Sequence, residues 1–152
     1  MSVDPLRRPI RLSGDDILPS EPGGEMVDAI LAELRELEGP SLFERTEPPI
    51  RSASAEYRIL ELRKALTNTR LRRGGDYYAS SHWRSVAAWV KRERGHRCES
   101  CGSSAGLHAH HNDEYVWLGE ERPIDLTVLC MGCHNEAHGW PRKGLSGSPS
   151  GR

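Results

Sequence analysis

Two cysteine pairs in the C-terminal half of the chain are the first residues whose type and spacing point to chemistry. They form two CxxC knuckles, which contain all 4 cysteines of the sequence. Thiolates are good Zn²⁺ ligands, and two knuckles complete a tetrahedron that leaves no open position for water. We therefore predict one structural zinc, which holds the fold and does not catalyse a reaction. Its ligands are Cys98, Cys101, Cys130 and Cys133.

The main alternative for these cysteines is redox chemistry, which a single CxxC pair can support. Two matched pairs with no spare cysteine favour the zinc site. The spacer, residues 102–129, is longer than the roughly 15–20 residues of the commonest zinc ribbons, so we expect further structure between the knuckles. No apolar run reaches the about 18 residues of a membrane span, and no signal-peptide pattern is present. We therefore expect a cytoplasmic protein, whose cysteines bind metal instead of forming disulfides.

Four of the 7 histidines lie around the second knuckle and can form a second site. His134 and His138 are four residues apart, so on a helix both rings lie on one face and can share a metal ion. His110 and His111 are adjacent, and on a strand their side chains point to opposite sides. Only one of these two can readily join the ion. The other could act as a base, because an unperturbed imidazole, with a pKa of about 6.5, is mostly neutral at cellular pH.

A helix is predicted just before the first knuckle. It begins at Ser80 or Ser81, either of which can cap it, and it ends at Gly95. Its apolar face has helical spacing and consists of Trp83, Val86, Ala87 and Val90. Basic residues of the same helix lie largely off that face and are candidates for contacts with DNA phosphates. They are Arg84, Lys91, Arg92 and Arg94.

A short hairpin and three further helices account for most of the remaining pattern. Residues 107–111 and 125–129 are predicted to form two strands, and residues 131–138 form a helix after the second knuckle. Two amphipathic helices, at about residues 26–37 and 54–66, precede this part of the chain and are joined by a proline-rich linker. Packing or contact with a partner explains these two helices better than chemistry does.

Composition limits both the fold and its partners. Of the 152 residues, 36% are hydrophobic and 28% are charged, so the core is modest, and small cores often need a metal. A net charge of −1 argues against a uniformly basic nucleic-acid binder. From Arg70 to Arg97, however, basic residues far outnumber the two acids, Asp76 and Glu93. On charge alone, this stripe is equally well a phosphate-binding surface or a solvated helix face.

A series of short motifs runs in order from Tyr77 to Gly139. They are Tyr77-x-x-Ser80-x-x-Trp83-Arg84, Cys98-x-x-Cys101-Gly102, Leu107-x-Ala109-His110-His111, Tyr115-x-Trp117-Leu118-Gly119-x-Glu121, Asp125-Leu126-x-Val128-Leu129-Cys130-x-x-Cys133-His134 and His138. Each motif alone is weak, but together and in register they resemble the HNH endonucleases, also called ββα-metal or His-Me finger nucleases. Residues 1–76 have no part in the resemblance.

The resemblance implies a role for each histidine of the second site. His110 would bind a catalytic ion, and His111 would be the general base that activates water. His134 would be a second ligand, and His138 would complete the set. The central Asn of the family signature falls at Asp125, which would be part of the catalytic site. Its carboxylate can accept but not donate a hydrogen bond, and it would favour a protonated His111.

The fold expected is α+β: a small ββα-metal finger, made of a two-stranded antiparallel hairpin and a helix, stapled by the four-cysteine zinc site. Before it come α-helices and a disordered leader. Residues 1–24 are this leader, since they combine four prolines with no apolar period. A helical extension with its linker follows (25–76), then the HNH nuclease domain (77–142) and a flexible tail (143–152).

The function implied is a metal-dependent DNA endonuclease that hydrolyses phosphodiester bonds with a single ion and a histidine base. The ion could be Mg²⁺, Mn²⁺, Ni²⁺ or Zn²⁺, because a histidine-rich site does not select one of them. One alternative is a non-catalytic zinc module that binds nucleic acid or protein. Another is a phage packaging accessory nuclease whose N-terminal helices dock a protein partner. No membrane partner is expected.

Overall fold

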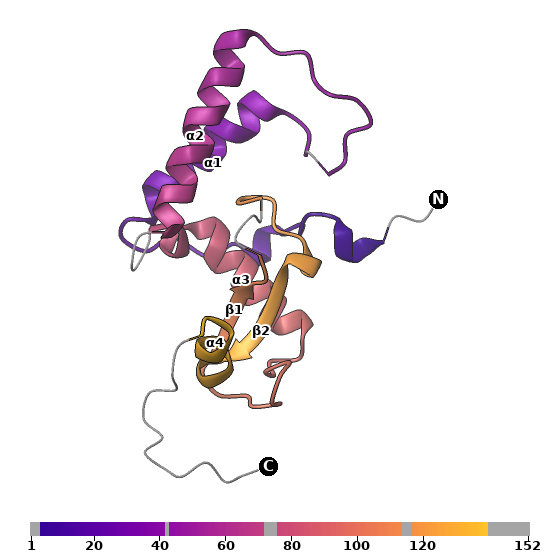
Figure 1. Ribbon diagram of the computed structural model, residues 1–152, viewed down its shortest axis with the longest axis vertical. Helices are drawn as coiled ribbons and strands as arrows, with labels where there is room; N and C mark the ends of the chain where they lie inside the picture. Colours follow the sequence, from indigo (N-terminus) through magenta and orange to yellow (C-terminus); the bar gives the residue numbers. More distant parts are fainter. Residues whose placement is uncertain (1–3, 42, 72–75, 114–116, 140–152) are drawn as a thin grey trace.

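The computed structural model describes residues 4–41, 43–71, 76–113 and 117–139, and these form an α+β structure (Figure 1). Strands β1 (Leu107–His111) and β2 (Leu126–Cys130) make an antiparallel hairpin in which Leu107 is opposite Cys130. The described α-helices are α1 (Gly24–Glu38), α2 (Ala53–Leu71), α3 (Ser81–Glu93) and α4 (Met131–Ala137). Short 3₁₀ turns are η1 (Pro5–Arg7), η2 (Gly14–Asp16), η3 (Asp76–Ala79) and η4 (Pro123–Asp125). The predicted α+β class, the helices and the antiparallel hairpin are confirmed.

Helices α1 and α2 form the upper part of the molecule in Figure 1 and pack through apolar residues at helical spacing. The buried residues of this pair are Val27, Leu31, Leu34, Ile59, Leu62 and Leu66. Helix α1 begins at Gly24, where a Cβ atom would lie only 2.1 Å from the Ala79 carbonyl oxygen. Only glycine therefore lets the start of α1 approach the backbone of η3 so closely. Helix α2 runs past the predicted end near residue 66, and Thr69 in this additional stretch is buried.

Helix α3 connects the α1–α2 pair with the hairpin. Its N-cap is Ser80, whose Oγ accepts a hydrogen bond from Trp83 N at 3.1 Å, as predicted for a capping serine. The buried face of α3 joins one cluster with the buried residues of α1, α2 and the inner face of β2. The predicted helical extension (25–76) and the finger therefore share one hydrophobic core. Helix α4 packs on β1 and β2 in the lower part of Figure 1.

The course of residues 4–24 differs from the disordered leader that the sequence predicts. Leu18 N donates to Ser85 Oγ at 2.8 Å, and Ser81 Oγ donates to the Leu18 carbonyl at 2.6 Å, so the segment is tied to α3. Ile10 N donates to the Glu121 carbonyl at 2.9 Å, and the Ile10 side chain packs against the core. The prolines restrict the backbone of this segment. The segment has no apolar period, and hydrogen bonds to α3 and to the Glu121 backbone hold it in place instead.

The linker between α1 and α2 supplies cations to the end of α1. Arg51 Nη2 and Arg45 Nη2 donate to the Glu38 carbonyl at 2.9 and 2.7 Å, which satisfies a backbone oxygen at the helix C-terminus. None of the described helices is long and apolar enough to cross a membrane. The predicted tail, residues 143–152, lies outside the described residues.

Candidate metal centres and the buried glutamate

The four cysteines converge as the sequence predicts. Their sulfur atoms lie within 4.8 Å of one another, and Cys101 Sγ is 3.7 Å from Cys130 Sγ. A disulfide needs about 2.05 Å between sulfurs, whereas a tetrahedron of roughly 2.3 Å Zn–S bonds has edges of about 3.8 Å. The first knuckle follows α3, and the second joins β2 to α4. The geometry of the donor set fits a structural zinc ion.

The acidity of these thiols also fits a cation. Burial opposes ionisation of Cys98, but hydrogen bonds from the backbone of Cys130, Cys101 and Ser100 outweigh it and lower its pKa to about 6. The Ser100 side chain favours the thiolate of Cys133, yet the neighbouring Cys130 and burial raise the pKa of Cys133 to about 12. Without a cation, therefore, the four thiols do not all ionise together, and a bound Zn²⁺ would remove that conflict.

A second convergence consists of three histidines, His110 from β1 and His134 and His138 from α4 and its C-terminal cap. Their ligand atoms lie within 4.8 Å of one another, and His138 Nε2 is 3.3 Å from His134 Nε2. Tetrahedral Zn–N bonds of roughly 2.0–2.1 Å give nitrogen separations of about 3.3 Å. This set, named the His triad below, has the geometry expected of ligands to one divalent ion.

His108 lies on the same face of β1 as His110 and extends this cluster. Its ring stacks on His134 with a centroid distance of 5.2 Å and an interplanar angle of 19°. Burial first, and then the charges of His138, His108 and His110, lower the pKa of His134 to about 4. The pKa of His110 is also lowered, mainly by burial and by His138. Both rings are therefore neutral at neutral pH, which is the form that binds metal.

His111 lies on the opposite face of β1, away from the His triad. Its side chain is only 4% exposed, and its ring stacks on Trp83 of α3 with centroids 4.4 Å apart. Its Nε2 faces Glu121 Oε1 at 3.4 Å. The opposite directions of His110 and His111 follow from strand geometry and were predicted. The structure therefore does not place His111 beside the His triad, where it was predicted to act as the general base.

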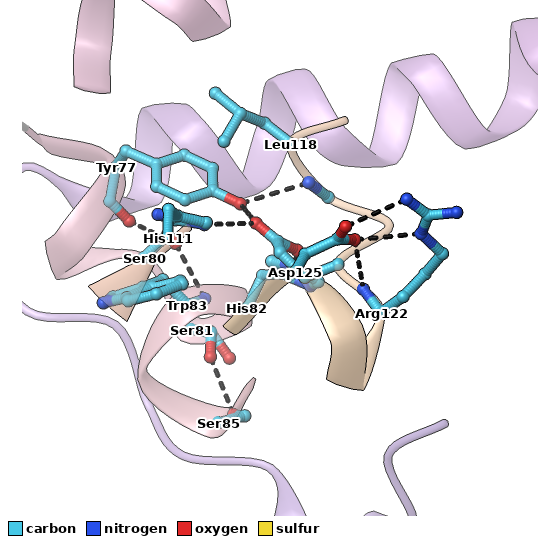
Figure 2. A network of polar contacts seen from close by, with 12 residues as sticks. Tyr77, Ser80, Ser81, His82, Trp83, Ser85, His111, Leu118, Arg122 and Asp125 are labelled. Carbon is cyan, nitrogen blue, oxygen red and sulfur yellow. Dashed lines mark hydrogen bonds and ion pairs between the residues drawn. The ribbon is translucent and has the colours of Figure 1, made fainter. Parts of the chain in front are cut away.

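Glu121 is the centre of a buried polar network that the sequence did not reveal. Figure 2 labels three of its partners, Tyr77, His82 and His111. Its side chain is 0% exposed, and its Oε2 lies 2.6 Å from His82 Nε2. The Tyr77 hydroxyl donates to Oε1 and accepts from Gly119 N at 3.1 Å. The only signal for Glu121 in the sequence was its place in the Leu118-Gly119-x-Glu121 motif. Nothing in the spacing of His82 on its helix marked it as a partner.

Opposing effects set the acidity of Glu121. Burial alone would raise its pKa, but the charges and hydrogen bonds of His82 and His111 outweigh burial and lower the pKa well below its ordinary value. Burial, followed by the Glu121 charge, raises the pKa of Tyr77. The network is thus a carboxylate held between two imidazoles, with a neutral phenol as donor.

Asp125 binds Arg122 instead of an imidazole (Figure 2). Its Oδ2 accepts from Arg122 N at 2.9 Å and from Arg122 Nε at 3.0 Å, and its Oδ1 accepts from Arg122 Nη2 at 2.9 Å. The Asp125 carbonyl accepts from Asn112 N at 2.9 Å, just beyond the last residue of β1. Asp125 therefore closes η4 and fixes the end of the hairpin at which the connecting loop begins and ends.

The arginines predicted to bind DNA are engaged within the protein. Arg84 pairs with Glu21 at 3.5 Å and donates to the Pro19 carbonyl, and Arg92 pairs with Asp16 at 2.9 Å. Both of these contacts hold the leader. Arg94 donates to Glu99 at 2.7 Å and to the Pro123 carbonyl at 2.9 Å, between the first knuckle and η4. Among the residues that the structure describes, the Lys91 ammonium has no ion pair.

Comparison with known proteins adds no relative. No protein-family model matches the chain, and neither a curated protein nor a solved structure matches it. The proposals below therefore rest on the geometry of the two metal centres and on the sequence motifs.

Proposed function

We propose that the protein is a metal-dependent DNA endonuclease of the HNH type, which hydrolyses phosphodiester bonds. The observation that carries this proposal is the His triad on the hairpin and α4, directly beside four cysteines with the geometry of a structural zinc site. A plain zinc module has no use for three converging imidazoles, of which His110 and His134 have pKa values lowered by burial. An ion bound there would supply Lewis-acid stabilisation of charge on a phosphate.

Each residue of the proposed site would have a separate role. His110, His134 and His138 would hold the ion, and the zinc knuckles would fix the relative positions of β1 and α4. In the proposal, His111 is the base that accepts a proton from water, and His111 must then leave its contact with Trp83 or reach the substrate from the other face of β1. Asp125 would keep the end of the hairpin in place through Arg122.

A second candidate is a non-catalytic zinc module that binds nucleic acid or protein. The burial of His111 against Trp83 favours this candidate, because a base has to reach the proton that it removes. In that case Glu121 and His111 would be structural partners, and substitution of His111 would change stability instead of a reaction.

Cleavage of supercoiled plasmid in Mg²⁺, Mn²⁺, Ni²⁺ or Zn²⁺ separates the candidates. The endonuclease proposal expects divalent-dependent nicking that is lost in His110→Ala and in His111→Ala. The exposed His96 lies outside both clusters, so His96→Asn, which suits its positive φ of 52°, is the matched control. Wild-type protein that cuts with none of the ions, or a His110→Ala variant as active as wild type, would overturn the proposal.

A further inference from the structure

The edge of β2 that faces away from β1 is bound by the chain that follows α3. In an antiparallel pair, alternate residues bond to the partner strand, and those between them turn their backbone groups outward. Val128 is an outward residue of this kind. Its carbonyl accepts from Glu99 N at 2.8 Å, and its own N–H donates to Glu99 Oε2 at 2.6 Å. Glu99, the second residue of the first knuckle, therefore occupies both backbone groups of Val128.

The next outward position on β2 is Cys130, which begins the second knuckle. Its backbone N–H donates to the sulfur of Cys98, the residue before Glu99. The first knuckle thus lies along the end of β2, with Glu99 beside Val128 and Cys98 beside Cys130. These contacts bring the two cysteine pairs together without any bond to a metal.

Arg94 fixes the Glu99 carboxylate in this position. Its Nη1 lies 2.7 Å from Oε1 and 2.8 Å from Oε2 of Glu99, and its Nη2 donates to the Pro123 carbonyl at 2.9 Å. The Arg94 and Glu99 side chains are 25% and 35% exposed, and an ion pair at such exposure adds little stability of its own. A carboxylate that accepts from both a guanidinium and a backbone N–H has, however, lost much of its rotamer freedom. The pair therefore orients Glu99 toward Val128.

We propose that Glu99 is a positioning residue of the zinc site, which docks the first knuckle on β2 and so holds its two thiolates beside those of the second knuckle. Arg94, which the sequence predicted to contact DNA, has the role of anchoring that carboxylate. Without Glu99 the first knuckle can separate from β2, and a zinc ion is then held less firmly. The inference does not depend on the endonuclease proposal, because a non-catalytic zinc module would use the same site.

The test is the retention of zinc by the zinc-loaded full chain. Partners outside the ligand set typically change metal affinity by about 10–100-fold, so Glu99→Ala should bind zinc at least about tenfold less tightly in competition with a chelator. Because all four ligands remain, the loss should appear as faster release of zinc to an excess of a pyridylazo dye. Glu99→Gln keeps one oxygen that can accept from Val128 N, and its release rate should lie between those of Glu99→Ala and wild type.

Two control variants make this result specific. Glu93→Ala removes an exposed glutamate of α3 that pairs with Arg92 at 3.7 Å, and it should release zinc at the wild-type rate. Gly119→Ala crowds Leu31 and tests whether general instability speeds release, at a temperature at which circular dichroism shows every variant to be folded.

A spectrum separates positioning from ligation. With Co²⁺ in place of zinc, Glu99→Ala should keep the thiolate-to-metal absorption of wild type, because no ligand is removed. A changed absorption would mean that Glu99 belongs to the ligand set, and it would overturn the positioning role. Wild-type retention in Glu99→Ala, equally fast release in Gly119→Ala, or wild-type protein without zinc would overturn the inference as well.

Discussion

His82 Nε2 and Glu121 Oε2 lie 2.6 Å apart and join the first turn of α3 to the loop between the two strands. Neither side chain is exposed by more than 10%. Removing a charge from water is costly, and such a pair persists only where its remaining hydrogen bonds are satisfied. Tyr77 and His111 satisfy them here. One carboxylate therefore holds α3, η3, β1 and the loop between the strands in their relative positions.

Replacement of that carboxylate should destabilise the protein strongly. In Glu121→Ala two imidazoles and a phenol lose their common partner, and losing one partner of a buried pair costs roughly 3–5 kcal/mol. Glu121→Gln, which keeps the shape, should lose less. Urea unfolding measures both, with the less buried neighbour in Glu120→Gln as control. If Glu121→Ala were as stable as the control, the network would not hold the fold.

The same group predicts a loss of stability in acid. Because the folded pKa of Glu121 lies below its ordinary value of 4.5, the carboxylate stabilises the fold at pH above 4.5. That contribution is lost as the pH falls below 4.5 toward the folded pKa. The free energy of unfolding of Glu121→Gln should therefore depend less steeply on pH in this range than that of wild type. Parallel slopes for the two proteins would contradict the assignment.

Purified protein should contain about one tightly bound zinc per chain, and Cys130→Ser should unfold the finger. The reason is that the binding free energy of a structural zinc is folding free energy. Elemental analysis and circular dichroism check the two parts. Ser103→Ala, beside the first knuckle, serves as a control that keeps all four thiolates. Folded protein without any zinc would show that the knuckles close by other means.

The His triad should bind a second divalent ion, and His110→Ala should weaken that binding more than about tenfold, a loss above roughly 1.4 kcal/mol. His108→Ala keeps all three ligands and is the control. In protein without this ion, the lowered pKa of His134, about 4, means that the unfolded chain binds protons which the folded chain does not bind. Stability should therefore fall as the pH decreases from 6.5 toward 4. Calorimetry with Mn²⁺ and with Zn²⁺ measures the affinities. If His110→Ala bound the ion as tightly as wild type, the His triad would not be the binding site.

The leader should resist trypsin at Arg11, contrary to the expectation of a disordered segment. Its neighbour Ile10 is hydrogen-bonded to Glu121, and the Arg11 side chain binds Glu44. Ser85→Ala removes the acceptor of Leu18 N and should speed cleavage at Arg11. Mass spectrometry of timed digests locates the cuts. Equal cleavage rates at Arg11 and at the exposed Arg7 would show that the leader is not docked.

Gly119→Ala should destabilise the protein more than Gly39→Ala does, although both glycines have a positive φ, 89° and 70°. A Cβ at residue 119 would lie 2.5 Å from Leu31 Cδ2, whereas one at residue 39 meets nothing within 4 Å. Overpacking of this kind costs about 1–3 kcal/mol beyond the backbone strain. In a double variant, Leu31→Ala should absorb part of the Gly119→Ala cost. Thermal unfolding of wild type, the three single variants and the double variant gives the comparison.

Short-range patterns predicted much of this molecule. Helical spacing located α1, α3 and α4, the Ser80 cap set the start of α3, and alternation located the hairpin. Ligand spacing also placed the four cysteines and the His triad in two groups. Each helix, the hairpin strands and each half of the two ligand sets depend on residues that are close in sequence, and ligand chemistry joins the halves.

What the sequence did not reveal depends on contacts between distant residues. Glu121 meets His82, 39 residues away, and Leu18 meets Ser85, 67 residues away. No local pattern marks such pairs, since each partner taken alone looks like an ordinary residue of its own segment. For the same reason the arginines in and after α3 were predicted to bind phosphate, although Arg84 and Arg92 bind acids of the leader and Arg94 binds Glu99.

The shared core has a consequence for the order of folding during synthesis. Helix α1 leaves the ribosome early, but Leu31 packs against Gly119, and its cluster is completed only by Leu126 and Val128. The apolar face of α1 is therefore only partly covered, by α2, until residues 119–128 have emerged. Contacts between such distant residues form slowly, because a long loop has to close first. The nascent protein is thus most prone to aggregation just before the zinc knuckles can form.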